Sequence, residues 1–287
     1  MVDPESHRAA TERWREHRMA ALHRSDGWLA LAGLVWLRDG SNSVGSDASC
    51  DVVLPEGPPH AGSVVVREGR ATLLLASEAG PGRNGEAATV VDLRDDLAGD
   101  PTSVQVGPLR LTVINREGQL AIRVWDPDRP RRFRVTRVDH YPVDIRWRVE
   151  ARLEPDSSPP EVLAPTVVGP GQTYPVLGRM VFEHEGATHG LLAYDELGAH
   201  DPFIVFGDLT NADETYGGGR YLYAEGPDES GRVVLDFNRA YNPPCVFTPY
   251  TVCALAMPGN RLPFRVEAGE KRFASTSSKE VSRSPNA

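Results

Sequence analysis

Short β-prone runs recur about every ten residues along most of this chain, and Gly-, Pro- and Asp-rich turns separate them. The runs alternate apolar and polar residues or are rich in β-branched residues, which is typical of strands. Short strands at this spacing indicate a β-sandwich or a β-barrel. In the first half of the chain, strands are predicted at Asp51–Leu54, Ser63–Arg67, Ala71–Leu75, Leu109–Asn115, Leu120–Trp125, Phe133–Val138 and Ile145–Ala151.

One long helix is predicted from Pro4 to His23, ahead of these strands. The apolar residues of this helix form a loose stripe, and Arg and Glu residues lie between them. The stripe consists of Ala10, Trp14, Met19 and Leu22. Gly27 ends the helix, and the apolar run Trp28–Leu37 that follows fits a buried strand or a packed turn.

A Pro-rich stretch divides the remaining sequence, because prolines stiffen a linker and are excluded from the interior of a sheet. After it, strands are predicted at Gly178–His184, His189–Tyr194, Phe203–Asp208, Arg220–Tyr223, Arg232–Phe237 and Pro263–Val266. The fold class predicted is therefore mainly β, an N-terminal helix followed by two β domains of sandwich or barrel type. The predicted segments are a helix (1–26), a β-sandwich-like domain (27–152), a linker (153–166), a second β domain (167–273) and a disordered tail (274–287).

Composition indicates the cellular compartment expected for this protein. No run approaches the ~18 apolar residues of a membrane helix, and the Arg- and Glu-rich N-terminus does not resemble a signal peptide. Three cysteines cannot form a disulfide framework. We therefore expect a cytoplasmic protein without a membrane partner.

Charge is unevenly distributed along the chain. Arg110–Arg152 has eleven arginines against six acidic residues, whereas Val181–Asp236 has twelve acidic residues against two arginines. Phosphate binding requires a positive face, so nucleic acid is not an expected partner.

The densest group of polar residues lies between Asp208 and Cys245. Its first part contains Asp208, Glu214, Tyr216 and Arg220, with three glycines directly before Arg220. Glycines allow positive φ and close backbone approach, which serve either a ligand loop or a tight hairpin. Arg220 is the obvious counter-charge, so we expect at least one carboxylate to hold it, either as a structural salt bridge or as part of a clamp for a carboxylate or phosphate.

The second part of this group contains Asp236, Asn238, Asn242 and Cys245. Asp236 and Asn238 share one face of an extended strand, where they face solvent or line a polar cavity. Cys245 follows a rigid Asn-Pro-Pro sequence, which suits either a nucleophile or a packed structural thiol.

His184 and His189 flank a predicted hairpin turn. With a nearby carboxylate they could bind a metal ion, or they face solvent. No familiar catalytic or nucleotide-binding signature occurs, so the sequence indicates no reaction and no cofactor.

Several strings between Trp28 and Lys271 resemble the bacterial and archaeal family known as domain of unknown function 1684. They are Trp28–Leu37, Val113–Gly118, Phe206–Asn211, Glu214–Leu222, Leu235–Cys245, Asn260–Pro263 and Ala268–Lys271. This resemblance implies no particular chemistry.

A second resemblance covers about Asp39 to Gly85. Gly45–Pro55, His60-Ala61 and Asn84-Gly85 are similar to the forkhead-associated sandwich, which reads phosphothreonine. That family has Arg where Ser46 stands and Ser-Arg where Pro58-Pro59 stand. Since such groups hold the phosphate, the resemblance implies a related sandwich shape and not phosphopeptide binding.

Two functions are consistent with these patterns. The first is a site for a small polar or anionic molecule in the second β domain, for binding or for catalysis. The second is a non-enzymatic interaction or scaffold module. A site requires the polar residues between Asp208 and Cys245 to converge on one pocket, whereas a scaffold disperses them into local bonds.

Overall fold

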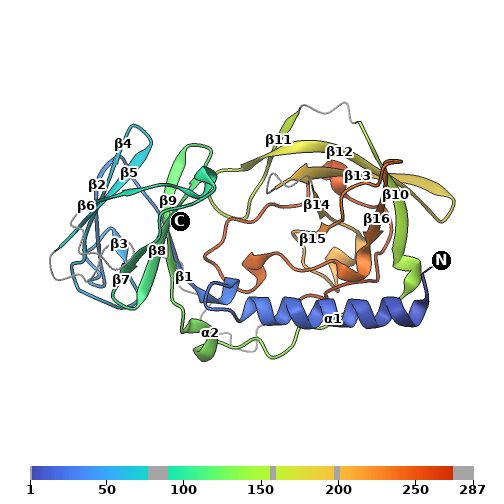
Figure 1. Cartoon of the computed structure of the whole chain (residues 1–287), viewed down its shortest axis with the longest axis horizontal. Coiled ribbons are helices and arrows are strands. Elements are labelled where there is room, and N and C mark those ends of the chain that lie inside the picture. The colour runs from blue at the N-terminus through green and yellow to red at the C-terminus, as the bar shows by residue number, and fades with distance from the viewer. Residues whose placement is uncertain (1, 77–89, 156–159, 197–200, 274–287) are drawn as a thin grey trace. The chain divides into compact units, whose positions relative to one another are not determined.

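The chain is mainly β in a computed structural model that describes residues 2–76, 90–155, 160–196 and 201–273 (Figure 1). Helix α1 spans Pro4–Leu22, and α2, Arg129–Arg132, is a single turn. These are the α-helices of the described residues, so the predicted fold class and the early position of the long helix are confirmed. The predicted tail, residues 274–287, lies outside the described residues.

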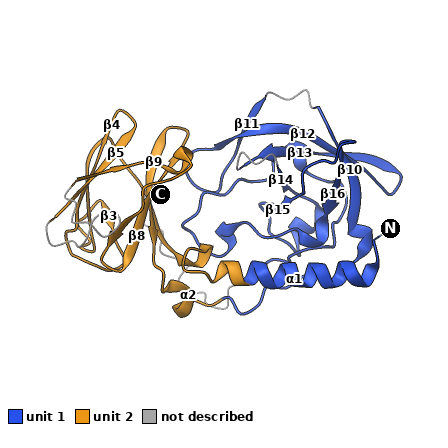
Figure 2. Cartoon of the chain, in the orientation of Figure 1, with its two compact units in different colours: residues 1–19, 135–287 blue, residues 20–134 orange. Residues whose placement is uncertain are grey.

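The chain forms two compact units, shown in Figure 2. Unit 1 comprises residues 1–19 and 135–287, and unit 2 comprises residues 20–134. Unit 1 is therefore built from two separate parts of the sequence.

Unit 2 consists of two sheets around one core. One sheet has the strand order β1-β9-β8-β7, and the other has the order β3-β2-β4-β5-β6. Apolar residues of both sheets, such as Val64, Leu73, Leu111 and Ile122, form a single buried cluster. The strands are β1 (Leu31–Trp36), β2 (Gly40–Gly45), β3 (Val52–Val53), β4 (Gly62–Arg67), β5 (Arg70–Leu75), β6 (Val90–Leu93), β7 (Val104–Val106), β8 (Leu109–Arg116) and β9 (Gln119–Trp125).

Unit 1 is built on one sheet with the order β15-β14-β13-β12-β10-β16, and β11 pairs with β12. Its strands are β10 (Arg148–Glu154), β11 (Glu161–Ala164), β12 (Gln172–His184), β13 (Ala187–Asp195), β14 (Pro202–Phe206), β15 (Arg220–Tyr223) and β16 (Arg232–Asp236). Glu185 and Gly186 connect β12 to β13 with φ of 51° and 78°. Positive φ at both residues is what a two-residue hairpin turn requires, and glycine adopts it without strain.

Both faces of this sheet are covered. Along β14, Ile204 and Phe206 belong to one buried cluster, whereas Phe203 and Val205 belong to another. Successive side chains of a strand point to opposite faces. Burial on both faces thus explains why the run Phe203–Phe206 is apolar without alternation.

Helix α1 docks on unit 1 through a polar stripe. Asp3 caps the helix by accepting a hydrogen bond from the Ser6 backbone N–H at 2.9 Å. His7 and Thr11, which lie four residues apart on one face, are buried, and so is Leu22 of the predicted apolar stripe. Ala10, Trp14 and Met19 of the predicted apolar stripe are only half-buried.

The predicted linker, 153–166, does not separate the two units. β10 pairs with β12 and β16, and β11 pairs with β12, so both belong to the sheet of unit 1. The units divide instead between Arg134 and Val135. Residues 156–159 of this stretch lie outside the described residues.

Two predicted strands, Phe133–Val138 and Pro263–Val266, are not strands in the structure. Val135, Val138 and Val266 are nevertheless buried, so their apolar character reflects packing of irregular segments. In the part of the chain that the structure describes, no helix has the length and apolarity of a membrane span.

Candidate functional site

Asp208 and Arg220 form a buried ion pair in unit 1. Arg220 begins β15 and pairs across the sheet with Phe206, two residues before Asp208. Its Nη2 lies 2.7 Å from Oδ2 of Asp208, and both side chains are 0% exposed. The prediction that a carboxylate holds Arg220 is confirmed.

The backbone uses most of the remaining hydrogen-bonding capacity of this pair. Arg220 donates to the carbonyl oxygen of Val266 at 2.9 Å and to that of Ala268. Asp208 Oδ1 accepts from the N–H groups of Thr210, at 2.8 Å, and Val266, at 3.2 Å. The pair therefore fixes residues 266–268 against the sheet, and a ligand has no access to the guanidinium.

Glu214 lies at the centre of a second cluster. Its Oε2 accepts from the Tyr141 hydroxyl at 2.9 Å and from Arg265 at 2.7 Å, and its Oε1 accepts from Lys271 at 2.9 Å. Hydrogen bonds from Lys271, Tyr141 and Arg265 lower the pKa of the Glu214 carboxyl to about 2. This carboxylate holds three separate segments together.

Tyr216 and Cys245 contact each other beside Cys253. The Cys245 thiol donates to the Tyr216 oxygen at 3.6 Å, and the Cys245 N–H donates to Cys253 Sγ at 3.3 Å. The hydrogen bond with Cys253, together with burial, raises the pKa of the Cys245 thiol. A thiol with a raised pKa is a poor nucleophile, so the geometry is that of a packed structural cysteine.

Asn242 belongs to a fourth cluster, which anchors α1. Its backbone N–H donates to Glu270 at 2.7 Å, and its Nδ2 donates to the carbonyl oxygen of Lys271 at 2.8 Å. Arg18 of α1 bonds both Glu270, at 2.6 Å, and the Asn242 carbonyl oxygen, at 2.9 Å.

His184 and His189 contact the ring of Phe264. The ring centroids lie 4.3 Å and 4.8 Å from that of Phe264, and the two imidazoles are 6.4 Å apart. Among the described residues no group of three or more His, Cys, Asp or Glu side chains has the arrangement of a metal site. The two histidines belong to an aromatic cluster.

Asp236 and Asn238 lie together, but not on one face of an extended strand as predicted, because β16 ends at Asp236 and Phe237–Arg239 form a 3-10 turn that Asp236 caps. Asp236 Oδ1 accepts from the backbone N–H of Asn238, at 3.2 Å, and from its Nδ2, at 2.9 Å. Asn238 also bonds both backbone groups of Asp144, so its amide is fully used by the fold. The other oxygen of Asp236, Oδ2, contacts His7 of α1 at 2.8 Å.

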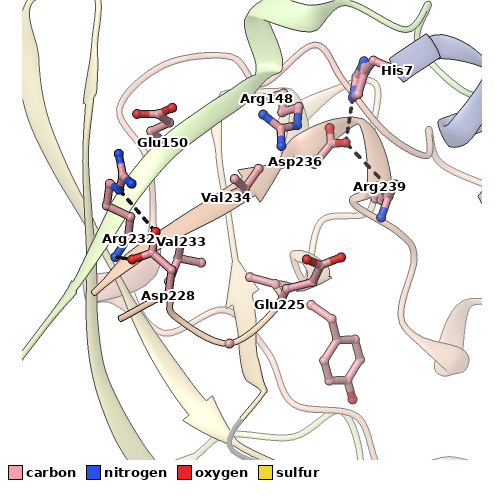
Figure 3. Close-up of a pocket in the computed structure, with 13 residues that line it drawn as sticks. His7, Arg148, Glu150, Glu225, Asp228, Arg232, Val233, Val234, Asp236 and Arg239 are labelled. Carbon is pink, nitrogen blue, oxygen red and sulfur yellow. Dashed lines mark hydrogen bonds and ion pairs between the residues drawn. The ribbon is translucent and has the colours of Figure 1, made fainter. Parts of the chain in front are cut away.

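Asp236 lines a cavity of about 450 Å³ in unit 1, shown in Figure 3. It is the one predicted site residue among those that line this cavity. The charged side chains around it come from α1, β10, β16 and the segments that flank β16. They are His7, Arg148, Glu150, Glu225, Asp228, Arg232, Asp236 and Arg239.

Strand pairing places Arg148 beside Asp236. The two residues are directly opposite each other in the antiparallel pair β10–β16, so their side chains share one face of the sheet. Arg239 approaches from the other side, with its Nε 3.6 Å from Asp236 Oδ2. The Asp236 carboxylate thus lies among one imidazole and two guanidinium groups (Figure 3).

Sequence reasoning missed His7, Arg148 and Arg239 as site residues. Arg239 lies three residues after Asp236, a spacing that carries a weak signal for an ion pair. His7 is 229 positions away from Asp236, and no local pattern indicates that contact.

Comparison with known proteins gives a family. Residues 133–271 match the family described as "Protein of unknown function (DUF1684)". A search of curated proteins finds no match. The forkhead-associated resemblance of residues 39–85 is not shown by any of these comparisons, and its Asn84-Gly85 lies outside the described residues.

One solved structure with a match is the solution NMR structure of an uncharacterized protein from Haloarcula marismortui. It is 28% identical, and the match covers 47% of this chain and 75% of that chain with a TM-score of 0.39. The family match covers every residue that lines the cavity except His7. Residues 133–271, just under half of the chain, are thus similar to the DUF1684 family.

Proposed function

We propose that unit 1 binds a small molecule through an anionic group, a carboxylate or a phosphate, in the cavity beside Asp236. The observation that carries the proposal is the pair of guanidinium groups at this cavity with donors that the fold does not use. A planar guanidinium offers five N–H donors that match the oxygens of carboxylate and phosphate.

Arg148 supplies the clearest unused donors. The residue is half-buried on the cavity face of β10, and no hydrogen bond or ion pair joins its guanidinium to another described residue. A half-buried cation is partly dehydrated, which strengthens its attraction for an incoming anion.

Arg239 supplies a second set of donors. Its ion pair with Asp236 is long, at 3.6 Å, and its side chain is 35% exposed. No hydrogen bond joins its guanidinium to another described residue. Its terminal nitrogens can therefore bind an oxyanion while Asp236 orients it.

Asp236 acts in this proposal as an anchor and not as a reacting group. His7 and Asn238 already donate to its two oxygens. A general base needs an oxygen free to accept a proton, so binding is favoured over catalysis by this carboxylate.

The acidic side chains at the cavity restrict the charge that the ligand can carry. The Asp228 carboxylate already accepts hydrogen bonds from the Ser230 hydroxyl, at 2.6 Å, and from Arg232 Nε, at 3.3 Å. Glu150 and Glu225 are exposed at the cavity and repel a highly charged anion. A ligand with one anionic group and polar or cationic groups fits best.

A scaffold role is the second candidate. Asp208, Arg220, Asn238 and Asn242 are used by internal bonds, as expected of a scaffold. Under that function the Arg148 guanidinium interacts with solvent alone, and that of Arg239 interacts with Asp236 and solvent.

Calorimetric titration of the full chain with inorganic phosphate and with lactate, which has one carboxylate and a polar hydroxyl, separates the two functions. We expect saturable binding of at least one probe, and a loss of about 10-fold or more in affinity for Arg148→Gln, because one charge-assisted hydrogen bond is worth roughly 1.5–3 kcal/mol. Arg152→Gln is the matched control, since Arg152 lies on the same strand and does not line the cavity. No saturable binding, or equal binding by wild type and Arg148→Gln, would overturn the proposal and leave the scaffold role.

A further inference from the structure

A second cavity of unit 1, of about 430 Å³, differs in chemistry from the first. Trp14 of α1, Tyr223 of β15 and Tyr241 after β16 contribute aromatic rings to its lining. The ring centroids of Trp14 and Tyr241 lie 6.3 Å apart, and those of Tyr223 and Tyr241 lie 6.4 Å apart with the planes inclined by 15°. Three rings from distant parts of the chain therefore meet at one cavity.

Carboxylates complete the lining of this cavity. Asp195, Asp201 and Glu225 face it, and Arg239 is the one basic residue among those that line it. Asp201 and Glu225 are exposed, so a ligand can reach both carboxylates. The lining thus has an excess of negative charge beside π-electron-rich faces.

The tyrosines are fixed in position. The Tyr223 hydroxyl donates a hydrogen bond to the Glu196 carboxylate. The Arg18 guanidinium lies 4.1 Å from the centroid of the Tyr241 ring, which shows that this ring already accepts a cation inside the fold. A preordered aromatic surface loses little conformational entropy when a ligand binds.

We propose that this second cavity binds an organic cation, such as a quaternary ammonium or a substituted amine. Aromatic faces attract cations through the ring quadrupole, and weakly hydrated organic cations leave water more easily than metal ions do. Nearby carboxylates add long-range attraction without a required geometry. The cavity volume leaves room for an organic body in addition to the charged group.

The two cavities share Tyr223, Ala224, Glu225 and Arg239. One molecule with an anionic and a cationic group can therefore reach both. The cation site does not depend on the anion site, because two of its aromatic rings, Trp14 and Tyr241, and two of its carboxylates, Asp195 and Asp201, do not line the first cavity.

Choline and its uncharged isostere 3,3-dimethylbutan-1-ol test the inference on the full chain. Titration followed by NMR chemical shifts should give saturable binding of choline and at least about 10-fold weaker binding of the isostere. Tyr223→Leu should weaken choline binding by about 3- to 30-fold, the range of a cation–π contact. Tyr223 is 39% exposed, so this change leaves the core of the unit intact.

Glu225→Gln supplies a second variant at an exposed position. It should weaken binding of choline and leave binding of the isostere unchanged. Trp28→Leu is the control for loss of an exposed aromatic side chain, since Trp28 is 36% exposed and belongs to unit 2.

Failure of this inference is distinguishable from failure of the anion site. Arg148→Gln should leave choline binding unchanged, because Arg148 lines the first cavity and not the second. Equal affinity for choline and the isostere, or no saturable choline binding by the folded wild type, would overturn the cation site whatever phosphate does.

Discussion

Two aspartates of unit 1 each hold an arginine, in different surroundings. Asp208 and Arg220 are 2.7 Å apart with 0% exposure of both side chains. Asp236 and Arg239 are 3.6 Å apart, with side-chain exposures of 11% and 35%. In the first pair the carbonyl oxygens of Val266 and Ala268 accept from the terminal nitrogens of Arg220, and its Nε is buried without a partner among the described residues. In the second pair the guanidinium faces a cavity.

Residue type does not distinguish a structural pair from a binding pair. Both pairs are Asp–Arg contacts near the end of a strand in the same sheet. What differs is whether a ligand can reach the donors that the fold has not used. A fully buried pair stabilises the fold, and a half-exposed pair with spare donors can recognise a ligand.

Arg220→Ala should have the largest effect on stability. It leaves the Asp208 carboxylate buried without its counter-charge, which costs about 3–5 kcal/mol. Urea unfolding followed by circular dichroism measures the free energy of unfolding directly.

Arg148→Ala is the matched control for this comparison. The guanidinium of Arg148 has no hydrogen-bond or ion-pair partner among the described residues, so its removal should change the free energy of unfolding by only about 0.5 kcal/mol. Similar losses for the two variants would contradict the distinction between a buried and an open arginine.

His7→Ala should have an intermediate effect. His7 is 4% exposed and bonds the Asp236 carboxylate at 2.8 Å, so truncation leaves a buried acceptor with one donor fewer and costs about 1–3 kcal/mol. His17→Ala, at an exposed position of the same helix, should be nearly neutral. Equal melting temperatures of the two variants would show that the His7–Asp236 contact does not hold α1.

Glu214→Gln should have the smallest effect on the free energy of unfolding, and that effect should depend on pH. The folded state lowers the pKa of this carboxyl from 4.5 to about 2, so its contribution to stability is complete above about pH 4.5 and is lost as the pH falls toward 2. The side chain is 36% exposed, so solvent screening limits the contribution to roughly 1 kcal/mol. Unfolding free energies at pH 7 and pH 3 should differ less in the variant than in the wild type, and Glu12→Gln should leave that difference unchanged.

Local pattern was enough to predict the class of the fold and that a carboxylate holds Arg220. Alternation and turn residues mark strands without knowledge of their partners. Arg220 opens a strand in a segment with twelve acidic residues and one other arginine, so an ion pair was the expected outcome.

Contacts between residues that lie far apart in the sequence could not be predicted in the same way. Arg148 lies at the cavity because β10 pairs with β16 in a register that places it opposite Asp236. His7 reaches the same carboxylate across 229 positions. The division between units was also hidden, because prolines near residue 155 indicate a break, whereas strand pairing on both sides of them defines the sheet.

The split composition of unit 1 constrains the order in which the chain folds as it is synthesised. Unit 2 is continuous in sequence and is complete once residue 134 has been added. In contrast, α1 cannot form its contacts with Asp236 and Glu270 until those residues have been added. Until then the 19 residues of α1 form a lone helix of marginal stability. The N-terminal segment is thus made first and reaches its final place last, after the closure of a loop of 252 positions between Arg18 and Glu270.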